Sequence, residues 1–153
     1  MFGLYLEQGE FEKALSQAGE AAGKSRECMG LLAGRAYAFR GNAYAVADEY
    51  ITAGNDSTAV SVKFGHESFG ELAKRINEAR RKGKIIVGWI HSHPNYGCFL
   101  SATDVRTQKT YFTEEFSTAV VTDPVRRETK AFKLVSGNAD GYREAGFATY
   151  RKA

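Results

Sequence analysis

The chain of 153 residues is long enough for one globular domain with its own core, and 43% apolar and 25% charged residues are ordinary for such a domain. A net charge of +3 without a dense basic stripe argues against nucleic-acid binding, and no apolar run approaches the length of a membrane span. The first residues lack the basic start of a signal peptide, and two cysteines make no disulfide framework. We therefore expect residues 1 to 153 to form a single cytoplasmic domain, with Cys28 and Cys98 as buried free thiols.

The first half of the chain alternates between short strands and amphipathic helices. Apolar residues at helical spacing predict one helix over residues 10 to 23 and a second over residues 69 to 79, which ends in a basic cluster before Gly83. Positive charge at that end suits the helix macrodipole, so we interpret the cluster as a solvated terminus rather than a binding patch. Strands are expected at residues 2 to 6, 28 to 34, 43 to 51 and 60 to 64, with a turn at Gly41 and Asn42.

The second half begins with an apolar strand over residues 84 to 91, and a helix follows from Ser101 to about residue 112. Alternating residues predict strands at 116 to 122 and 129 to 135, and a weak periodicity over residues 140 to 152 predicts a short terminal helix. This order of elements is typical of an α/β or α+β fold, with a mixed or mainly antiparallel sheet flanked by helices.

The candidate site lies where the strand at 84 to 91 leads toward the next helix. His91 and His93 are two residues apart, and such residues share one face of a strand, so both imidazoles are expected to face the same point. Asp104, at the end of the first turn of the predicted helix, supplies a carboxylate. Two histidines and one carboxylate leave a fourth position for water, as in catalytic zinc sites, and zinc is our hypothesis. The same residue types suit non-haem iron(II), which remains the alternative.

Hydrolysis at such a site needs a general base and a group that stabilises the oxyanion. Glu27 and Glu49 are the carboxylates on apolar backgrounds, and spacing alone does not choose between them. Ser101 stands three residues before Asp104, which resembles a helix capping box with Asp in place of Glu. Its hydroxyl is therefore expected to orient an oxyanion, to cap the helix, or to do both. His66 has no partner at a metal-binding spacing and is interpreted as a surface or capping residue.

The spacing His91-x-His93, seven residues, Ser101, two residues, Asp104 resembles the signature of the JAMM (MPN+) metalloprotease family. The resemblance covers the chain from about residue 3 to residue 135, and it implies a central curved sheet sandwiched by helices, similar to cytidine deaminase. Residues 27 to 34 and 87 to 94 are also similar to segments of the family. Residues 95 to 101 and 131 to 134 are similar to its proteasome-lid and signalosome branch.

The resemblance implies a zinc-dependent isopeptidase that removes ubiquitin or a ubiquitin-like modifier from lysine. Under it, His91, His93 and Asp104 hold one Zn²⁺ ion per chain. Glu27 is the general base, which takes the proton of the attacking water and passes it to the leaving amine. Ser101 helps to stabilise the oxyanion.

Substrate and partners follow from the same resemblance. The extended tail of the modifier is expected to add as a strand along residues 56 to 66, and the branch implies a proteasome or related complex as partner, with neither nucleic acid nor membrane. The chain ends at Ala153, without the longer region by which the eukaryotic lid enzyme docks an inactive partner, so we expect autonomous activity or docking elsewhere. Ile90 also replaces the aromatic residue usual in the branch, which leaves the chemistry untouched.

Two other functions stay open. One is a peptidase of the same family that processes the C-terminus of a sulfur-carrier or ubiquitin-like precursor. The other is a non-catalytic MPN scaffold subunit of a large complex. The presence of the complete set of base, ligands and serine argues against the scaffold, because silent relatives typically lose some of these residues.

Overall fold

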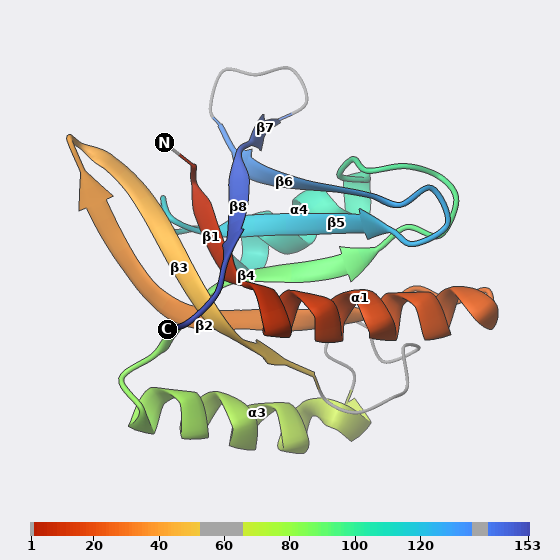
Figure 1. Cartoon of the computed structure of the whole chain (residues 1–153), viewed down its shortest axis with the longest axis horizontal. Helices are drawn as coiled ribbons and strands as arrows, with labels where there is room; N and C mark the ends of the chain where they lie inside the picture. The colour runs from red at the N-terminus through yellow and green to blue at the C-terminus, as the bar shows by residue number, and fades with distance from the viewer. Residues whose placement is uncertain (1, 53–65, 136–140) are drawn as a thin grey trace.

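The computed structural model describes residues 2–52, 66–135 and 141–153, so the strand predicted at 60 to 64 lies outside the described residues. In Figure 1, α1 lies in front of a strongly curved sheet and α4 lies behind it. The elements in chain order are β1 (Leu4–Glu7), α1 (Gln8–Gly23), β2 (Met29–Phe39), β3 (Asn42–Ile51), α3 (His66–Arg81), β4 (Ile85–Ser92), α4 (Ala102–Tyr111), β5 (Thr118–Asp123), β6 (Glu128–Leu134), β7 (Tyr142–Ala145) and β8 (Phe147–Tyr150).

The eight described strands form one sheet in the order β7-β6-β5-β4-β2-β3-β1-β8. The pairs β1–β3, β1–β8 and β4–β5 are parallel and the other pairs are antiparallel, so the prediction of a mixed sheet flanked by helices is confirmed. β7 and β8 stand at opposite ends of this order, yet only Gly146 separates them in the chain. The Gly3 N–H donates to the Gly146 carbonyl at 2.9 Å. The sheet is therefore nearly closed, with a seam beside Gly3 and Gly146.

The helix predicted over residues 140 to 152 is wrong. This segment forms β7 and β8, which pair with β6 and β1 respectively. Tyr142, Phe147 and Tyr150 favour strands, and the pairing with two distant strands supplies backbone hydrogen bonds that a short helix would have to make locally. A weak helical spacing does not compete with those long-range partners.

Local chemistry accounts for the other boundaries. α1 begins at Gln8, two residues before the predicted start, because the Glu7 side chain caps it by accepting the Glu10 N–H at 2.8 Å. The turn between β2 and β3 consists of Arg40 and Gly41, one residue earlier than predicted, with φ of 51° and 78°. Positive φ at both central residues is the signature of a two-residue hairpin turn that matches the twist of the strands.

The core has two layers, one on each face of the sheet. On one face α1 packs against apolar residues that include Leu4, Leu32 and Val120. On the other face α3 and the end of α4 cover a second group that includes Trp89 and Val121. Within the described residues, no helix is both long and apolar enough to cross a membrane.

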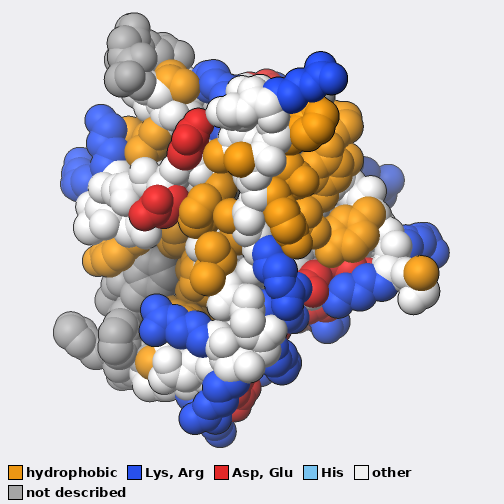
Figure 2. Space-filling view, turned by 90° about the vertical axis from the view of Figure 1, so that its left-hand side faces the viewer, with side chains coloured by type: hydrophobic (Ala, Val, Ile, Leu, Met, Phe, Trp, Pro, Cys, Tyr) orange, Lys and Arg blue, Asp and Glu red, His pale blue; other side chains and the backbone are white. Residues whose placement is uncertain are grey.

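The β2–β3 hairpin extends beyond these layers and carries exposed aromatic residues. Tyr37 and Phe39 are 45% and 54% exposed, and Tyr37 stacks on Tyr44 with ring centroids 5.4 Å apart. Figure 2 looks onto this side of the molecule and shows hydrophobic side chains gathered between Lys and Arg residues.

Candidate metal centre

The end of β4 places two histidines in the interior of the molecule. His91 pairs in register with Met29 of β2 on one side and with Val121 of β5 on the other. One residue past the strand, the His93 N–H still donates to the Thr122 carbonyl at 2.9 Å. Both imidazoles are almost fully buried, at 3% and 2% exposure. The backbone on three strands therefore holds both rings in place.

The start of α4 brings a carboxylate to the same point. Ser101 is the N-cap, and its Oγ accepts the Asp104 N–H at 3.1 Å, while Asp104 Oδ2 accepts the Ser101 N–H at 2.9 Å. This is a complete capping box, as the sequence predicted. The same Asp104 Oδ2 lies 3.1 Å from His91 Nε2 and 3.1 Å from His93 Nε2.

This arrangement fits a divalent metal. Ligand atoms bound tetrahedrally at zinc distances lie about 3.3 Å from one another, close to the two 3.1 Å separations here. Both ring nitrogens of His91 are buried: Nδ1 has no hydrogen-bond partner among the described residues, and the 3.1 Å contact of Nε2 with Asp104 Oδ2 lacks hydrogen-bond geometry. An unsatisfied buried nitrogen is costly, and metal coordination would satisfy one of them. The donor set suits zinc or iron(II).

The electrostatics of the cluster favour an ionised Asp104. Burial raises the pKa of its carboxyl, but the two histidines and the Ser101 N–H outweigh burial and hold that pKa well below the usual range. A carboxyl that stays ionised is available as a metal ligand at any ordinary pH.

Glu27 is held next to this cluster. The Cys28 N–H donates to Ser92 Oγ at 2.8 Å, and the Ser92 N–H donates to the Cys28 carbonyl at 2.9 Å, which joins the residue after Glu27 to the end of β4. Burial raises the pKa of the Glu27 carboxyl, and the nearby charges of His93 and His91 partly oppose this. Glu27 is thus half-buried and within electrostatic range of the candidate ligands.

Glu49, the other carboxylate that the sequence left open as a base, lies elsewhere on β3. Its Oε1 accepts a hydrogen bond from Lys84 Nζ at 3.0 Å, and Lys84 also lies 3.1 Å from Asp48. The carboxylate of Glu49 is therefore engaged in an ion pair with the residue that precedes β4. The base therefore remains assigned to Glu27 as a prediction.

Sequence reasoning missed the residues that support the ligands. His93 Nδ1 lies 3.1 Å from the Gly97 carbonyl, which suits an Nδ1–H donor and leaves Nε2 for a metal. Asp123 in turn accepts the N–H groups of Gly97 and Asn95 at 2.8 and 2.9 Å. Nothing local in the sequence links Asp123 to residues 95 to 97, so its supporting role is visible only in the folded chain.

Aromatic rings pack on both histidines. Trp89 stacks on His91 with centroids 4.3 Å apart, and Tyr96 stacks on His93 at 4.6 Å. Phe99 lies 5.0 Å from His93, and both Tyr96 and Phe99 are about half exposed, at 45% and 40%. The candidate centre is therefore packed against the buried ring of Trp89 on one side and the partly exposed rings of Tyr96 and Phe99 on the other.

The remaining predictions near the centre have mixed outcomes. Cys28 and Cys98 are both free, but only Cys28 is buried, whereas Cys98 is partly exposed. The segment expected to receive a substrate tail, residues 56 to 66, lies outside the described residues except for the backbone of His66 at the start of α3.

Known proteins resemble this chain over most of its length. The sequence profile of the family described as JAB1/Mov34/MPN/PAD-1 ubiquitin protease matches residues 5–115. Subunit 5 of the COP9 signalosome complex from Oryza sativa subsp. japonica is 37% identical over 108 residues, which are 69% of this chain and 29% of that protein. The ubiquitin carboxyl-terminal hydrolase RPN11 of Saccharomyces cerevisiae is 37% identical over 92 residues, covering 54% of this chain and 29% of its own length. The chain thus spans about 29% of the length of these two relatives.

Two solved structures share the fold. Protein DSY2949 from Desulfitobacterium hafniense matches with a TM-score of 0.68 at 19% identity, over 97% of this chain and 94% of its own. A JAB1/MPN domain protein from Archaeoglobus fulgidus matches with a TM-score of 0.55 at 18% identity, over 95% of this chain and 97% of its own.

Proposed function

The chain belongs to the JAB1/Mov34/MPN/PAD-1 ubiquitin protease family, and we propose that it is a zinc-dependent isopeptidase that removes ubiquitin or a ubiquitin-like modifier from conjugates. The observation that carries the proposal is Asp104 Oδ2, which lies 3.1 Å from Nε2 of both His91 and His93. These three side chains would hold the metal, and their ligand atoms all lie within 4.8 Å of one another.

A zinc ion held by these three side chains would supply a water of near-neutral pKa and would polarise the scissile carbonyl. Glu27 accepts the proton of the attacking water on its carboxylate and then donates it to the leaving lysine amine. Burial supports this role because it raises the pKa of the Glu27 carboxyl, which makes its carboxylate a stronger base. Ser101 Oγ, fixed at the start of α4, donates a hydrogen bond to the developing oxyanion.

Substrate and partner are part of the same proposal. Relatives are named as a subunit of the COP9 signalosome, as a ubiquitin carboxyl-terminal hydrolase and as a regulatory subunit of the 26S proteasome. These names support a ubiquitin-like protein conjugate as substrate and a proteasome-like complex as partner. Tyr96 and Phe99, exposed beside His93, offer apolar contacts to residues that flank the scissile bond.

The test compares variants of the zinc-loaded protein on two substrates, isopeptide-linked diubiquitin and a linear ubiquitin-like fusion. We expect cleavage of diubiquitin, and we expect Glu27→Gln to lower kcat by about 10²- to 10⁴-fold while metal analysis still finds zinc. Glu49→Gln is the matched control, since Glu49 is ion-paired with Lys84, and it should cleave normally. If metal analysis finds no zinc and every substrate survives, the proposal that the chain is an enzyme is refuted. If only linear extensions are cleaved, the chain is a precursor-processing peptidase.

A further inference from the structure

A cavity lies at the opposite end of the sheet from the candidate metal centre. β4 and β5 run in parallel, and His91 lies near the end of β4. The cavity, of about 700 Å³, is lined by Ser117 just before β5 begins and by Leu134 at the end of β6, which runs antiparallel to β5. The seam of the nearly closed sheet at Gly3 and Gly146, the start of β3 and the segment that follows α4 line the rest of the cavity. Ligand sites commonly lie at the open ends of β-barrels, which this nearly closed sheet resembles.

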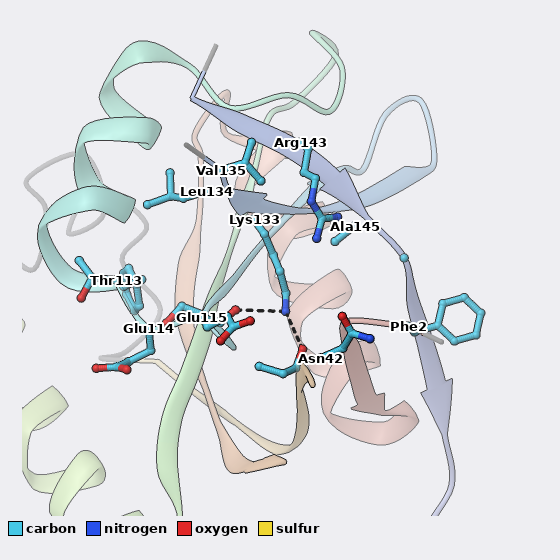
Figure 3. A pocket seen from close by; sticks show the side chains of 15 residues that line it. Phe2, Asn42, Thr113, Glu114, Glu115, Lys133, Leu134, Val135, Arg143 and Ala145 are labelled. Carbon is cyan, nitrogen blue, oxygen red and sulfur yellow. Dashed lines mark hydrogen bonds between the residues drawn. The ribbon is translucent and has the colours of Figure 1, made fainter. Parts of the chain in front are cut away.

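Two cations stand directly opposite one another in this cavity. Lys133 of β6 pairs in register with Arg143 of β7, so both side chains project from the same face of the sheet. Like charges in this position on neighbouring strands are destabilising. Lys133 is only 7% exposed, which removes most of the water that would otherwise screen the repulsion. Figure 3 shows Lys133 extended into the cavity with Arg143 beside it.

Neither cation has an ionic partner in the parts of the chain that the structure describes. Lys133 Nζ donates to the backbone carbonyls of Ala43 and Glu115, both at 3.3 Å, which uses two of its three protons. Arg143 Nη1 donates to the neighbouring Glu144 carbonyl at 3.3 Å. No described carboxylate oxygen lies within 4.0 Å of either side chain.

The fold accommodates this buried lysine rather than displacing it. A Cβ on Gly3 would lie 2.9 Å from Lys133 Cε, so the absence of a side chain at Gly3 leaves room for the lysine to cross the seam. Burial lowers the pKa of Lys133, the charge of Arg143 lowers it further, and Glu115 partly opposes both. A bound anion would relieve each of these costs.

We propose that this cavity binds a small organic carboxylate, held by Lys133 and Arg143. A guanidinium binds a carboxylate through two parallel hydrogen bonds, and the ammonium adds a third charge-assisted bond. Phe112 and Val135 line the same cavity and supply an apolar surface for the body of the ligand. Glu114 and Glu115 also line it, so a single negative charge fits better than the double charge of phosphate. This site is independent of the proposed hydrolase activity.

The test titrates the zinc-loaded protein with phenylacetate while backbone amide NMR signals are followed. Saturable shifts are expected at residues of β6 and β7. The neutral analogue phenylacetamide should bind at least about tenfold more weakly, because it lacks the charge. Inorganic phosphate should also bind more weakly than phenylacetate. Equal binding of the amide, stronger binding of phosphate, or no saturation with phenylacetate would each overturn the proposal.

Substitutions test whether Lys133 and Arg143 are the residues that bind phenylacetate. Arg143→Gln changes an exposed side chain and should weaken phenylacetate binding by about tenfold or more. Lys133→Met should do the same, and if it does not fold, Arg143→Gln decides alone. Lys130→Gln is the control, because Lys130 lies on the same strand, faces the other side of the sheet and pairs with Glu144 at 3.8 Å. A loss in Lys130→Gln as large as in Arg143→Gln would contradict the assignment.

Discussion

Ser92 and Cys28 are joined by two reciprocal hydrogen bonds. Ser92 Oγ accepts the Cys28 N–H at 2.8 Å, and the Ser92 N–H donates to the Cys28 carbonyl at 2.9 Å. Ser92 is completely buried and stands between the two histidines, whereas Cys28 directly follows Glu27. This contact therefore connects the candidate base to the candidate ligands across 64 residues of sequence.

Replacing Ser92 with Ala should weaken the link between the base and the metal centre, because it removes one of these two hydrogen bonds. The Cys28 N–H loses its buried acceptor, so we expect the free energy of unfolding to fall by about 1–3 kcal/mol. Because only the backbone bond from the Ser92 N–H to the Cys28 carbonyl then remains to position Glu27, kcat should fall by about 10²-fold, while zinc content stays unchanged. Urea unfolding measures the free energy of unfolding, and diubiquitin cleavage measures kcat.

Ser117→Ala is the matched control for that variant. Ser117 is also buried, but it lies before β5 at the far end of the sheet from the candidate metal centre. This variant should leave kcat near that of the wild-type protein. If Ser92→Ala cleaves as fast as Ser117→Ala, Ser92 has no positioning role.

The two roles of Ser101, as helix cap and as oxyanion donor, can be separated by substitution. Glycine at an N-cap costs only a few tenths of a kcal/mol relative to serine, yet it lacks the hydroxyl. Ser101→Gly should therefore keep nearly all of the stability and lower kcat by about 10²- to 10³-fold, as loss of an oxyanion donor does elsewhere. Ser101→Thr keeps both functions and should retain most activity. Full activity in the glycine variant would leave Ser101 with the capping role alone.

Relations between nearby residues could be predicted from the sequence. His91 and His93 face one point because residues two apart on a strand share a face, and Ser101 caps α4 through a residue three positions away. Both relations depend only on local backbone geometry. The proximity of Glu27 came from a family resemblance instead, since no local pattern connects it to β4.

Relations between distant residues could not be predicted in this way. β7 and β8 were mistaken for a helix because their partners, β6 and β1, are not marked in their own sequence. The opposition of Lys133 and Arg143 depends on that same unseen pairing. Sequence periodicity reports which face a residue occupies, whereas register against another strand is a property of the folded sheet.

Asp123 should make the fold sensitive to acid. Burial raises the pKa of its carboxyl, but hydrogen bonds from the backbone N–H groups of Arg126, Asn95, Gly97 and Val125 outweigh burial and lower it. A pKa that is lower in the folded than in the unfolded chain means that the ionised form stabilises the fold. This contribution is complete above the unfolded pKa of about 3.9 and is lost as the pH falls toward the folded value.

Asp123→Asn should therefore be less stable than the wild-type protein at neutral pH, with the difference shrinking below about pH 4. Urea unfolding at neutral pH and below about pH 4 measures the free energy of unfolding of both proteins. Glu144→Gln, which removes an exposed carboxylate, is the control and should change stability little. A stability difference between Asp123→Asn and wild type that does not depend on pH would show that the charge of Asp123 is unimportant.

Trp89, the single tryptophan of the chain, should report metal binding directly. Its ring stacks on His91 with centroids 4.3 Å apart and an interplanar angle of 13°. Metal coordination by His91 places a positive charge next to the indole face and orders the imidazole, so tryptophan emission should change until about one zinc ion per chain is bound. The measurement is a zinc titration of chelator-treated protein. His91→Gln should lose the response, whereas Glu27→Gln should keep it because a base is not a ligand. A response that survives in His91→Gln would locate the metal elsewhere.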